Sequence, residues 1–208
     1  MHLKKWLGFF SLALVLFTGA AAAQNYKPLA NPQTVESGNK IEVLEFFWYG
    51  CPHCFDLEPF MQKWAAKLPS DVEFRRVPAI PTERWAQGAR IFYTLEAMGL
   101  LERMHGEVFN AIQVNDVNLF NEKILLDWMA QKGVDRAKFS DAWRSFSVQS
   151  KTKRAAQLTQ AYDINSVPTL IVDGKYQTSV AMTGSPEGLV KTLDELIVKA
   201  RAERPKKK

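Results

Sequence analysis

The two cysteines of this 208-residue chain lie in one short segment, Cys51-Pro52-His53-Cys54. The segment follows an apolar stretch and precedes apolar residues at helical spacing, so we expect both sulfurs at the start of a helix. Backbone N–H groups without helical partners and the positive end of the helix dipole favour a thiolate at that position. The expected chemistry is thiol–disulfide exchange.

A purely structural disulfide is the simpler alternative for two cysteines. A bridge across two intervening residues closes a very small loop, and the restraint that a disulfide places on the unfolded chain grows with loop length. This spacing therefore favours a reactive pair over a structural one.

The elements around the cysteines predict a strand, a helix and a second strand. Residues 41–49 are β-branched and aromatic on both faces, which is typical of a central strand covered by helices on both sides. Pro52 suits the first turn of the helix, which should run to about Leu68, with a kink at Pro59. The strand from Val72 to Val77 should then be parallel to the first one.

The rest of the chain predicts a helical stretch followed by a hairpin and a last helix. Apolar stripes at helical spacing, among them Phe139, Trp143 and Phe146, fill residues 82–147, and a further helix covers about 150–162. Asp173-Gly174 should turn a hairpin between 169–172 and 175–178, and Ser185 should cap a helix to about Ala202.

This order predicts an α/β fold of the thioredoxin-like class with an inserted all-helical subdomain. We expect the thioredoxin-like domain to comprise residues 24–81 and 148–203 and the insertion to comprise 82–147. Residues 204–208 form a basic tail.

The first 23 residues predict a secretory signal peptide. Lys4 and Lys5 precede an apolar run, and Ala21-Ala22-Ala23 suggests cleavage after Ala23, which implies export to an oxidising compartment. Without Lys4 and Lys5, 25 of the 27 basic residues remain against 22 acidic ones. The body of the protein is thus near neutral, which gives little support to nucleic-acid binding.

The chain resembles the DsbA family of thiol:disulfide oxidoreductases. The resemblance rests on residues 45–54, with the sequence EFFWYGCPHC, on the helical insertion, and on Ser166-Val167-Pro168-Thr169 before the hairpin. It implies a periplasmic dithiol oxidase that donates the Cys51–Cys54 disulfide to newly exported proteins with free cysteines. It further implies reoxidation by a quinone-linked inner-membrane partner of the DsbB type; we expect a monomer with no cofactor beyond the disulfide.

Within the motif, Cys51 is the expected exposed nucleophile, because it lies nearest the helix start, and Cys54 is the buried partner. His53 can favour the Cys51 thiolate through a donated hydrogen bond or a positive charge, or it can be an ordinary exposed histidine. Pro52 limits local flexibility and offers no competing backbone donor.

Three further residues are candidates outside the motif. Glu45 interrupts the apolar face of its strand, so it either exchanges a proton with Cys54 or pairs with Arg75 or Arg76. The resemblance implies that Pro168 has a cis peptide bond and that the Val167 backbone pairs with an extended substrate peptide. Without the resemblance, the low frequency of cis bonds before proline favours a trans proline at the start of a strand.

Other functions remain open at this level. A disulfide isomerase or a reductase can share the fold, although an isomerase usually has a separate dimerisation domain and only about 17 residues separate Gln24 from the first strand. A metal-binding or peptide-carrier module is a different class. It lacks ligands, because only His53 and His105 are left to join the two thiols, and His105 is expected to be an ordinary surface residue.

Overall fold

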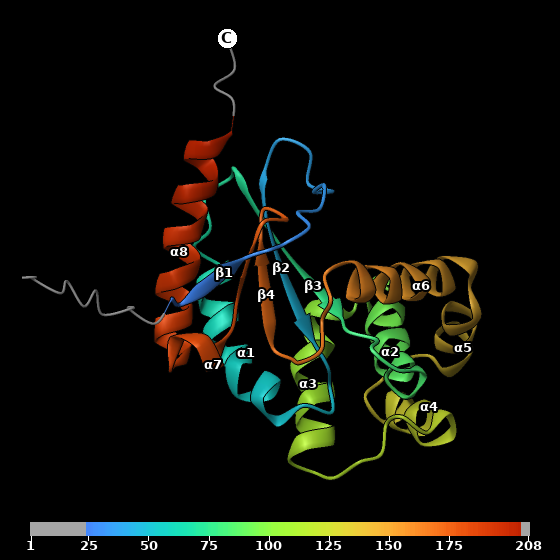
Figure 1. The fold of residues 1–208 in the computed structure, drawn as a ribbon. Helices are drawn as coiled ribbons and strands as arrows, with labels where there is room; N and C mark the ends of the chain where they lie inside the picture. Colours follow the sequence, from blue (N-terminus) through green and yellow to red (C-terminus); the bar gives the residue numbers. More distant parts are fainter. Residues whose placement is uncertain (1–23, 205–208) are drawn as a thin grey trace, which may run out of the picture.

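A computed structural model describes residues 24–204 of the chain, and the predicted signal peptide lies outside them (Figure 1). The described part contains a five-stranded sheet with the order β1-β5-β4-β2-β3 and helices on both of its faces. The strands are β1 (Tyr26–Pro28), β2 (Ile41–Phe47), β3 (Val72–Pro78), β4 (Thr169–Val172) and β5 (Tyr176–Thr178). The helices are α1 (Pro52–Ala65), α2 (Ala86–Ala97), α3 (Leu101–Gln113), α4 (Glu122–Gln131), α5 (Arg136–Arg144), α6 (Phe146–Ala161), α7 (Val180–Thr183) and α8 (Pro186–Glu203).

Two of the strand pairings were predicted. β2 is parallel to β3, as predicted, with Glu45 opposite Arg76, and it is also antiparallel to β4. β4 and β5 form the predicted hairpin, in which Asp173 and Gly174 both adopt positive φ angles, of 52° and 65°. Two consecutive positive φ angles are characteristic of the turn that joins twisted strands most directly.

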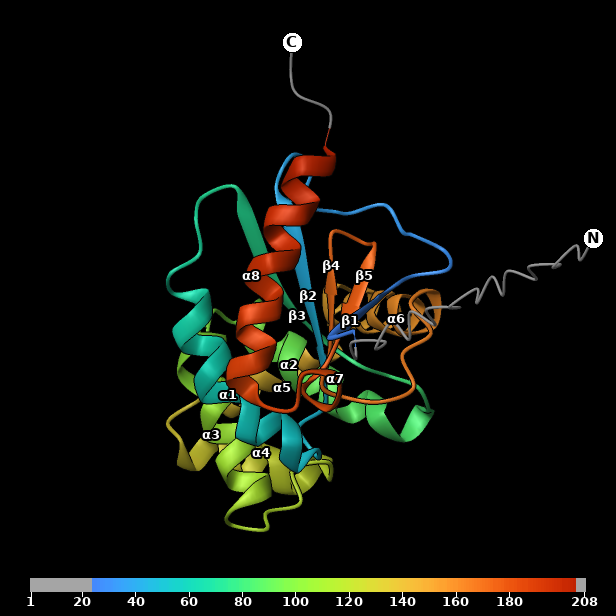
Figure 2. The same ribbon diagram turned by 60° about the vertical axis from the view of Figure 1, so that its left-hand side comes forward.

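Two hydrophobic cores lie on opposite faces of the sheet. On one face α1 and α8 cover β2 and β4 (Figure 2). On the other face α2 and α6 lie against the sheet, α3 lies next to α1 and α2 below the end of β2, and α4 and α5 extend this layer away from the sheet (Figure 1). Every residue of β2 is buried, as expected of a strand covered on both faces.

The inserted helices follow most of the predicted stripes, but not at their end. Phe139 and Trp143 are buried on α5, but Phe146 is 84% exposed and begins α6. The reason is Ser145, whose hydroxyl accepts a hydrogen bond from the N–H of Val148 and so starts a new helix there. α6 therefore crosses the predicted boundary between residues 147 and 148, and the domain limits themselves stay a prediction.

The sequence reading did not anticipate β1 or α7. β1 is a three-residue strand that pairs antiparallel with β5, and the segment after it continues along the hairpin. The N–H of Leu29 donates to the carbonyl of Lys175 and the N–H of Gln33 donates to that of Gly174. Such a short edge strand carries no periodicity of its own, because its partner alone determines where it forms.

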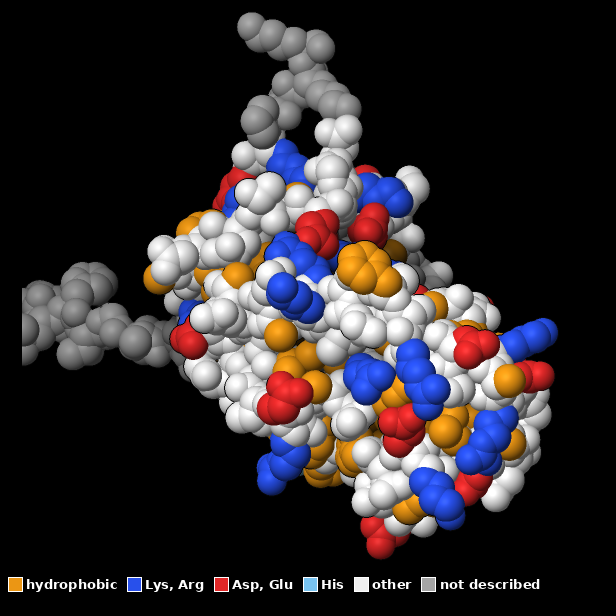
Figure 3. All heavy atoms as spheres, turned by 90° about the vertical axis from the view of Figure 1, so that its right-hand side faces the viewer, with side chains coloured by type: hydrophobic (Ala, Val, Ile, Leu, Met, Phe, Trp, Pro, Cys, Tyr) orange, Lys and Arg blue, Asp and Glu red, His pale blue; other side chains and the backbone are white. Residues whose placement is uncertain are grey.

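The surface of the helical layer carries charges of both signs. Figure 3 shows lysine and arginine side chains interspersed with acidic ones and with apolar atoms on this face. Among residues 24–204, no helix has the length and the apolar character that crossing a membrane requires.

The hairpin turn provides a test of the fold. A Cβ atom at Gly174 would lie far inside van der Waals distance of the Gln33 carbonyl oxygen, whereas one at Gly38, whose φ is 63°, meets nothing within 4 Å. We predict that Gly174→Ala lowers the free energy of unfolding by about 2–4 kcal/mol, and Gly38→Ala by only about 1 kcal/mol, the cost of a left-handed backbone. Urea denaturation measures both, and equal losses would contradict the close contact at Gly174.

Candidate active site

Cys51 occupies the N-cap of α1, directly after the loop that leaves β2. Its backbone is extended, with φ −98° and ψ 114°, and Pro52 follows as the first helical residue. Because proline has no N–H, the first backbone donors after the sulfur belong to His53 and Cys54, and both act on Cys51. The order of residue types thus directs two N–H groups toward Cys51.

The loop before Cys51 is held from two sides. The N–H of Cys51 donates to the Trp48 carbonyl at 2.9 Å, and the Gln113 side-chain amide of α3 donates to the Tyr49 carbonyl at 2.7 Å. The indole of Trp48 lies where a Cβ atom at Gly50 would be, so the ring folds back over the loop only because residue 50 is glycine. The helical layer therefore helps to fix the position of the cysteine pair.

The two sulfurs differ in burial and in acidity. Cys51 is 9% exposed and Cys54 1% exposed, so the expected exposed nucleophile is largely covered and is only the more accessible of the two. The hydrogen bond from the Cys54 side chain, together with the backbone N–H groups of Cys54 and His53 and the charge of His53, lowers the pKa of Cys51 to about 6. Burial, followed by the hydrogen bond and the charge of Cys51, raises the pKa of Cys54 strongly.

The remaining motif residues lie at the surface. Pro52 and His53 are both exposed, and the His53 ring borders a cavity of about 450 Å³. The ring charge of His53 lowers the pKa of Cys51 less than the hydrogen bond from Cys54 does. His53 thus acts on the sulfur through both its backbone N–H and its ring.

The loop before β4 lies against the cysteines. The Val167–Pro168 peptide bond is cis, as the resemblance implied, and the Val167 carbonyl oxygen lies 3.5 Å from Cys51 Sγ. The cavity beside His53 continues along this loop; its other lining residues are Asp56, Leu57, Ser166, Val167, Pro168, Ser179, Val180, Ala181 and Pro186. The structure thus brings Val167 and Pro168 together with the Cys51–Cys54 pair, although more than 110 residues separate them in the chain.

Glu45 is 1% exposed on the face of β2 that α1 covers. Its Oε2 atom lies 3.2 Å from Nε of Arg76, so the pairing that the sequence left open exists. Burial nevertheless raises the pKa of Glu45 to about 7, against the opposing effect of Arg76, and Glu58 adds to the rise. Glu45 can therefore pair with Arg76 and still bind and release a proton near neutral pH.

Three polar residues, Tyr49, Glu58 and His105, were not predicted as site residues, and together with Arg76 they form a buried cluster around Glu45. Nη2 of Arg76 donates to Oε1 of Glu58 at 2.8 Å, Oε2 of Glu58 lies 3.4 Å from Nε2 of His105, and the Tyr49 hydroxyl lies 2.8 Å from Nδ1 of His105. His105 is only 4% exposed, so its expected surface position is wrong. It faces inward because α3 packs its ring between Phe47, Phe92 and Phe109.

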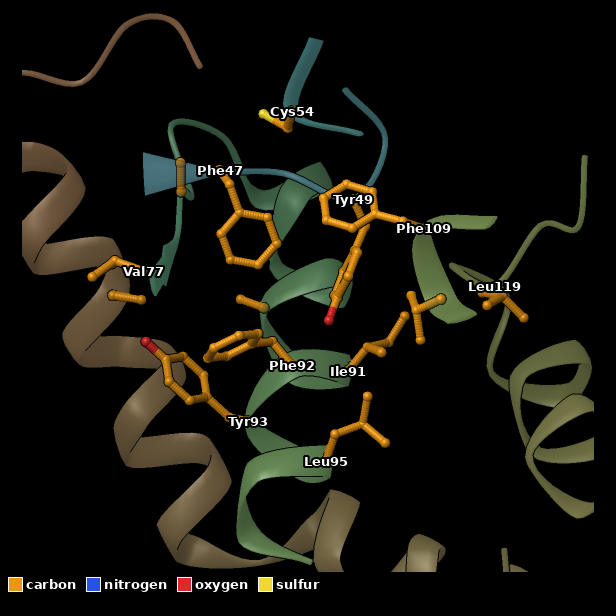
Figure 4. Packing of buried hydrophobic residues seen from close by; sticks show 14 of the residues in the cluster. Phe47, Tyr49, Cys54, Val77, Ile91, Phe92, Tyr93, Leu95, Phe109 and Leu119 are labelled. Carbon is orange, nitrogen blue, oxygen red and sulfur yellow. The ribbon is translucent and has the colours of Figure 1, made fainter. Parts of the chain in front are cut away.

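The position of Glu58 in the sequence could have indicated that it belongs to the site. It lies one helical turn after Cys54 and beside Leu57 on the buried side of α1, where an acidic residue needs a partner. In Figure 4, Cys54 lies at the edge of the aromatic cluster that includes Phe47, Tyr49 and Phe109. Within residues 24–204, no group of three or more His, Cys, Asp and Glu side chains is placed to hold a metal ion.

Comparison with known proteins identifies relatives over nearly the whole chain. A family model described as "DSBA-like thioredoxin domain" matches residues 61–194. The chain is 40% identical to the thiol:disulfide interchange protein DsbA of Pseudomonas aeruginosa over 185 residues, 89% of this chain and 88% of the relative. It is 37% identical to DsbA of Burkholderia cepacia, over 94% of this chain and 96% of that protein.

Solved structures agree with these relatives. The crystal structure of Pseudomonas aeruginosa DsbA superposes with a TM-score of 0.82 at 41% identity, covering 86% of this chain and 93% of that one. The oxidoreductase NmDsbA1 of Neisseria meningitidis gives 0.79 at 31% identity, covering 89% and 96%. The family model begins after the cysteine motif, but the 185-residue alignment with the Pseudomonas relative must include residues 51–54.

The hydrogen bond between the two thiols provides a test of the site. We predict that Cys54→Ala raises the pKa of Cys51 from about 6 toward that of a free thiol, about 8.5. The reason is the loss of the Cys54 thiol, the donor that lowers the pKa of Cys51 most. Cys54→Ser keeps an O–H donor at the same place and should keep the pKa of Cys51 near 6. The ultraviolet absorbance of the thiolate, followed against pH, measures both, and an unchanged titration in Cys54→Ala would assign the shift to the helix alone.

Proposed function

The chain belongs to the DSBA-like thioredoxin-domain family, and we propose that it is a periplasmic dithiol oxidase that transfers the Cys51–Cys54 disulfide to exported proteins. The observation that carries the proposal is the contrast between the two thiols, one with a pKa lowered to about 6 and the other with a strongly raised pKa. A thiol that ionises easily is a good leaving group and makes the reduced state favourable. Electrons should therefore flow from the client to this protein.

The reaction proceeds by two exchanges. A client thiolate attacks Cys51 Sγ in the disulfide, the bond to Cys54 breaks, and Cys54 leaves and takes up a proton. A second client thiolate then attacks the client sulfur of the mixed disulfide, and Cys51 leaves as a thiolate. The client gains a disulfide, and the protein is left as the Cys51 thiolate and the Cys54 thiol.

We assign the proton of Cys54 to Glu45. Cys54 is 1% exposed, so its sulfur cannot leave as an anion without a nearby donor. Glu45 is among the charged groups that act on Cys54, and its pKa of about 7 allows it to hold and release a proton near neutral pH. When the disulfide forms again, the proton returns from Cys54 to Glu45.

The loop around Val167 and the neighbouring cavity are the proposed client site. An extended client segment can pair with the Val167 backbone and bring its cysteine to Cys51, which lies 3.5 Å from the Val167 carbonyl. The adjoining cavity of about 450 Å³ has a partly apolar lining that includes Leu57 and Val180. It suits an apolar client side chain next to the reacting cysteine.

The surroundings of the reaction follow from the same proposal. Residues 1–23 are proposed as a signal peptide cleaved after Ala23, which places the mature protein in the periplasm. A quinone-linked membrane partner of the DsbB type accepts the two electrons from the reduced pair, and no other cofactor takes part. We propose that the protein acts as a monomer.

The direction of exchange is the decisive functional test. Oxidised protein should convert a peptide with two cysteines to its disulfide form in about a one-to-one ratio, and Cys51→Ser and Cys54→Ser, which cannot form the internal disulfide, should both abolish this. Given the disulfide form of the peptide instead, the Cys51 thiolate of Cys54→Ser should attack it, breaking the peptide disulfide to give a mixed disulfide and a free peptide thiol. Equilibration with glutathione buffers gives the reduction potential of the Cys51–Cys54 pair. A value close to the roughly −270 mV of thioredoxin, or faster repair of scrambled disulfides than oxidation of dithiols, would assign the chain to the reductases or isomerases instead.

A second prediction concerns stability. Because folding lowers the pKa of Cys51 from 9.0 to about 6, the reduced form gains stability that is fully present above pH 9 and is lost as the pH falls through 6. We expect reduced protein to melt several degrees above oxidised protein near pH 8, at about 2–4 °C per kcal/mol for a chain of this size. The difference should shrink steadily between pH 9 and pH 6.

Differential scanning calorimetry at several pH values measures the effect. Cys51→Ser provides the control, because it forms no internal disulfide and has no Cys51 thiolate, so its melting temperature should not depend on added reductant. A higher melting temperature for the oxidised wild-type protein at pH 8 contradicts the proposed direction of electron flow.

A further inference from the structure

The cluster beneath the cysteines holds more acidic charge than its basic side chain can balance. Glu45 and Glu58 both face the single guanidinium of Arg76, at 3.2 Å and 2.8 Å. With both carboxylates ionised and His105 and Tyr49 neutral, these five side chains carry one net negative charge. Since Glu45 and Glu58 are 1% and 6% exposed, water cannot offset that charge, and the cluster should bind one proton near neutral pH.

The contacts of His105 determine its tautomer. The Tyr49 hydroxyl lies 2.8 Å from Nδ1 and can donate to it, and an ionised Glu58 can only accept, so a neutral ring beside the Glu58 carboxylate carries its proton on Nε2. Tyr49 then donates to Nδ1, and the Nε2–H group points toward Oε2 of Glu58. Burial also lowers the pKa of His105, although Glu58 opposes the change, and this agrees with a neutral ring.

The two carboxylates differ in what surrounds them. Glu58 receives the 2.8 Å hydrogen bond from Arg76 on one oxygen, and its other oxygen lies 3.4 Å from Nε2 of His105, which has no hydrogen bond of good geometry among the described residues. Within the part of the chain that the structure describes, Oε2 of Glu45 has no hydrogen bond of good geometry, and neither does Nε of Arg76, although the two atoms are 3.2 Å apart. Glu58 is therefore the better stabilised anion, and Glu45 is the better place for the proton.

We propose that His105 is a positioning residue of the thiol–disulfide reaction: its Nε2–H group keeps Glu58 ionised, so that the proton of the cluster resides on Glu45, the carboxyl group that serves Cys54. This inference rests on the proposed function. Without the imidazole donor, the proton can settle on Glu58. Arg76 then pairs fully with an ionised Glu45, which has no proton to give when Cys54 leaves.

The groups that face His105 come from three elements besides its own. They are Tyr49 after β2, Glu58 on α1 and, through its charge, Arg76 on β3. The rest of its surroundings are the rings of Phe47, Phe92 and Phe109. An apolar ring could therefore replace His105 in packing. It could not replace the two nitrogen atoms, which face Tyr49 and Glu58.

The test compares His105→Phe, which fills the site without a donor, with His105→Gln, whose amide can still donate to Glu58. Carbon-13 NMR of labelled glutamate side chains in the reduced protein follows the protonation of Glu45 and Glu58. We expect the titration near pH 7 on Glu45 in the wild type, its transfer to Glu58 in His105→Phe, and its return to Glu45 in His105→Gln. Dithiol oxidation at pH 7 should fall about fivefold in His105→Phe, because most of Glu45 then lacks the proton that Cys54 needs when it leaves.

The outcomes separate this inference from the proposed function. If the wild type oxidises a dithiol peptide but Glu45 titrates alike in all three proteins, the role of His105 is wrong and the function stands. If the wild type does not oxidise dithiols, the function fails whatever the titrations show. Should His105→Phe not fold, nitrogen-15 NMR of wild-type His105 decides: the Nε2–H tautomer supports the role, and an Nδ1–H or doubly protonated ring at pH 7 overturns it.

Discussion

The hydrogen bond from the buried Cys54 thiol to Cys51 Sγ is the interaction on which the rest of the site depends. It is the largest of the effects that lower the pKa of Cys51, and it exists only while Cys54 keeps its proton. Burial of Cys54 is therefore part of the mechanism, because a thiol that cannot ionise in the interior remains a donor. The backbone N–H groups at the start of α1 add to this stabilisation. One turn of helix thus gives two identical residues opposite properties.

Elements distant in the chain hold the first turn of α1 and the cysteines in place. β2 delivers the loop, α3 holds it through Gln113, and the segment before β4 brings the Val167 carbonyl to the sulfur. The helical insertion does more than enlarge the core, since α3 also carries His105 into the charged cluster. A thioredoxin-like sheet with α1 alone could present the cysteines, but it would lack the contacts that Gln113 and His105 of α3 make with the site.

The parts of this protein that the sequence predicts are those with local causes. The β2–α1–β3 unit, the hairpin at Asp173-Gly174 and the N-cap position of Cys51 each depend on residues close to one another in the chain. β1 and the cluster around Glu58 and His105 depend on partners that are distant in sequence, so periodicity cannot reveal them. His105 illustrates the limit: its spacing on α3 places it beside Met104, but only the packed structure shows that its ring faces a carboxylate.

The cost of the buried cluster is itself an argument about its role. Paired charges in an interior are often no more stabilising than apolar residues of the same size, and an incompletely paired set is worse. Here Arg76 is shared between Glu45 and Glu58, and buried atoms of Glu45, Arg76 and His105 lack hydrogen bonds of good geometry among the described residues. An arrangement selected for stability alone would satisfy these atoms or remove them. An arrangement that must accept a proton when the disulfide forms and return it when Cys54 leaves needs an acid that is neither fully paired nor fully exposed, and Glu45 meets that condition.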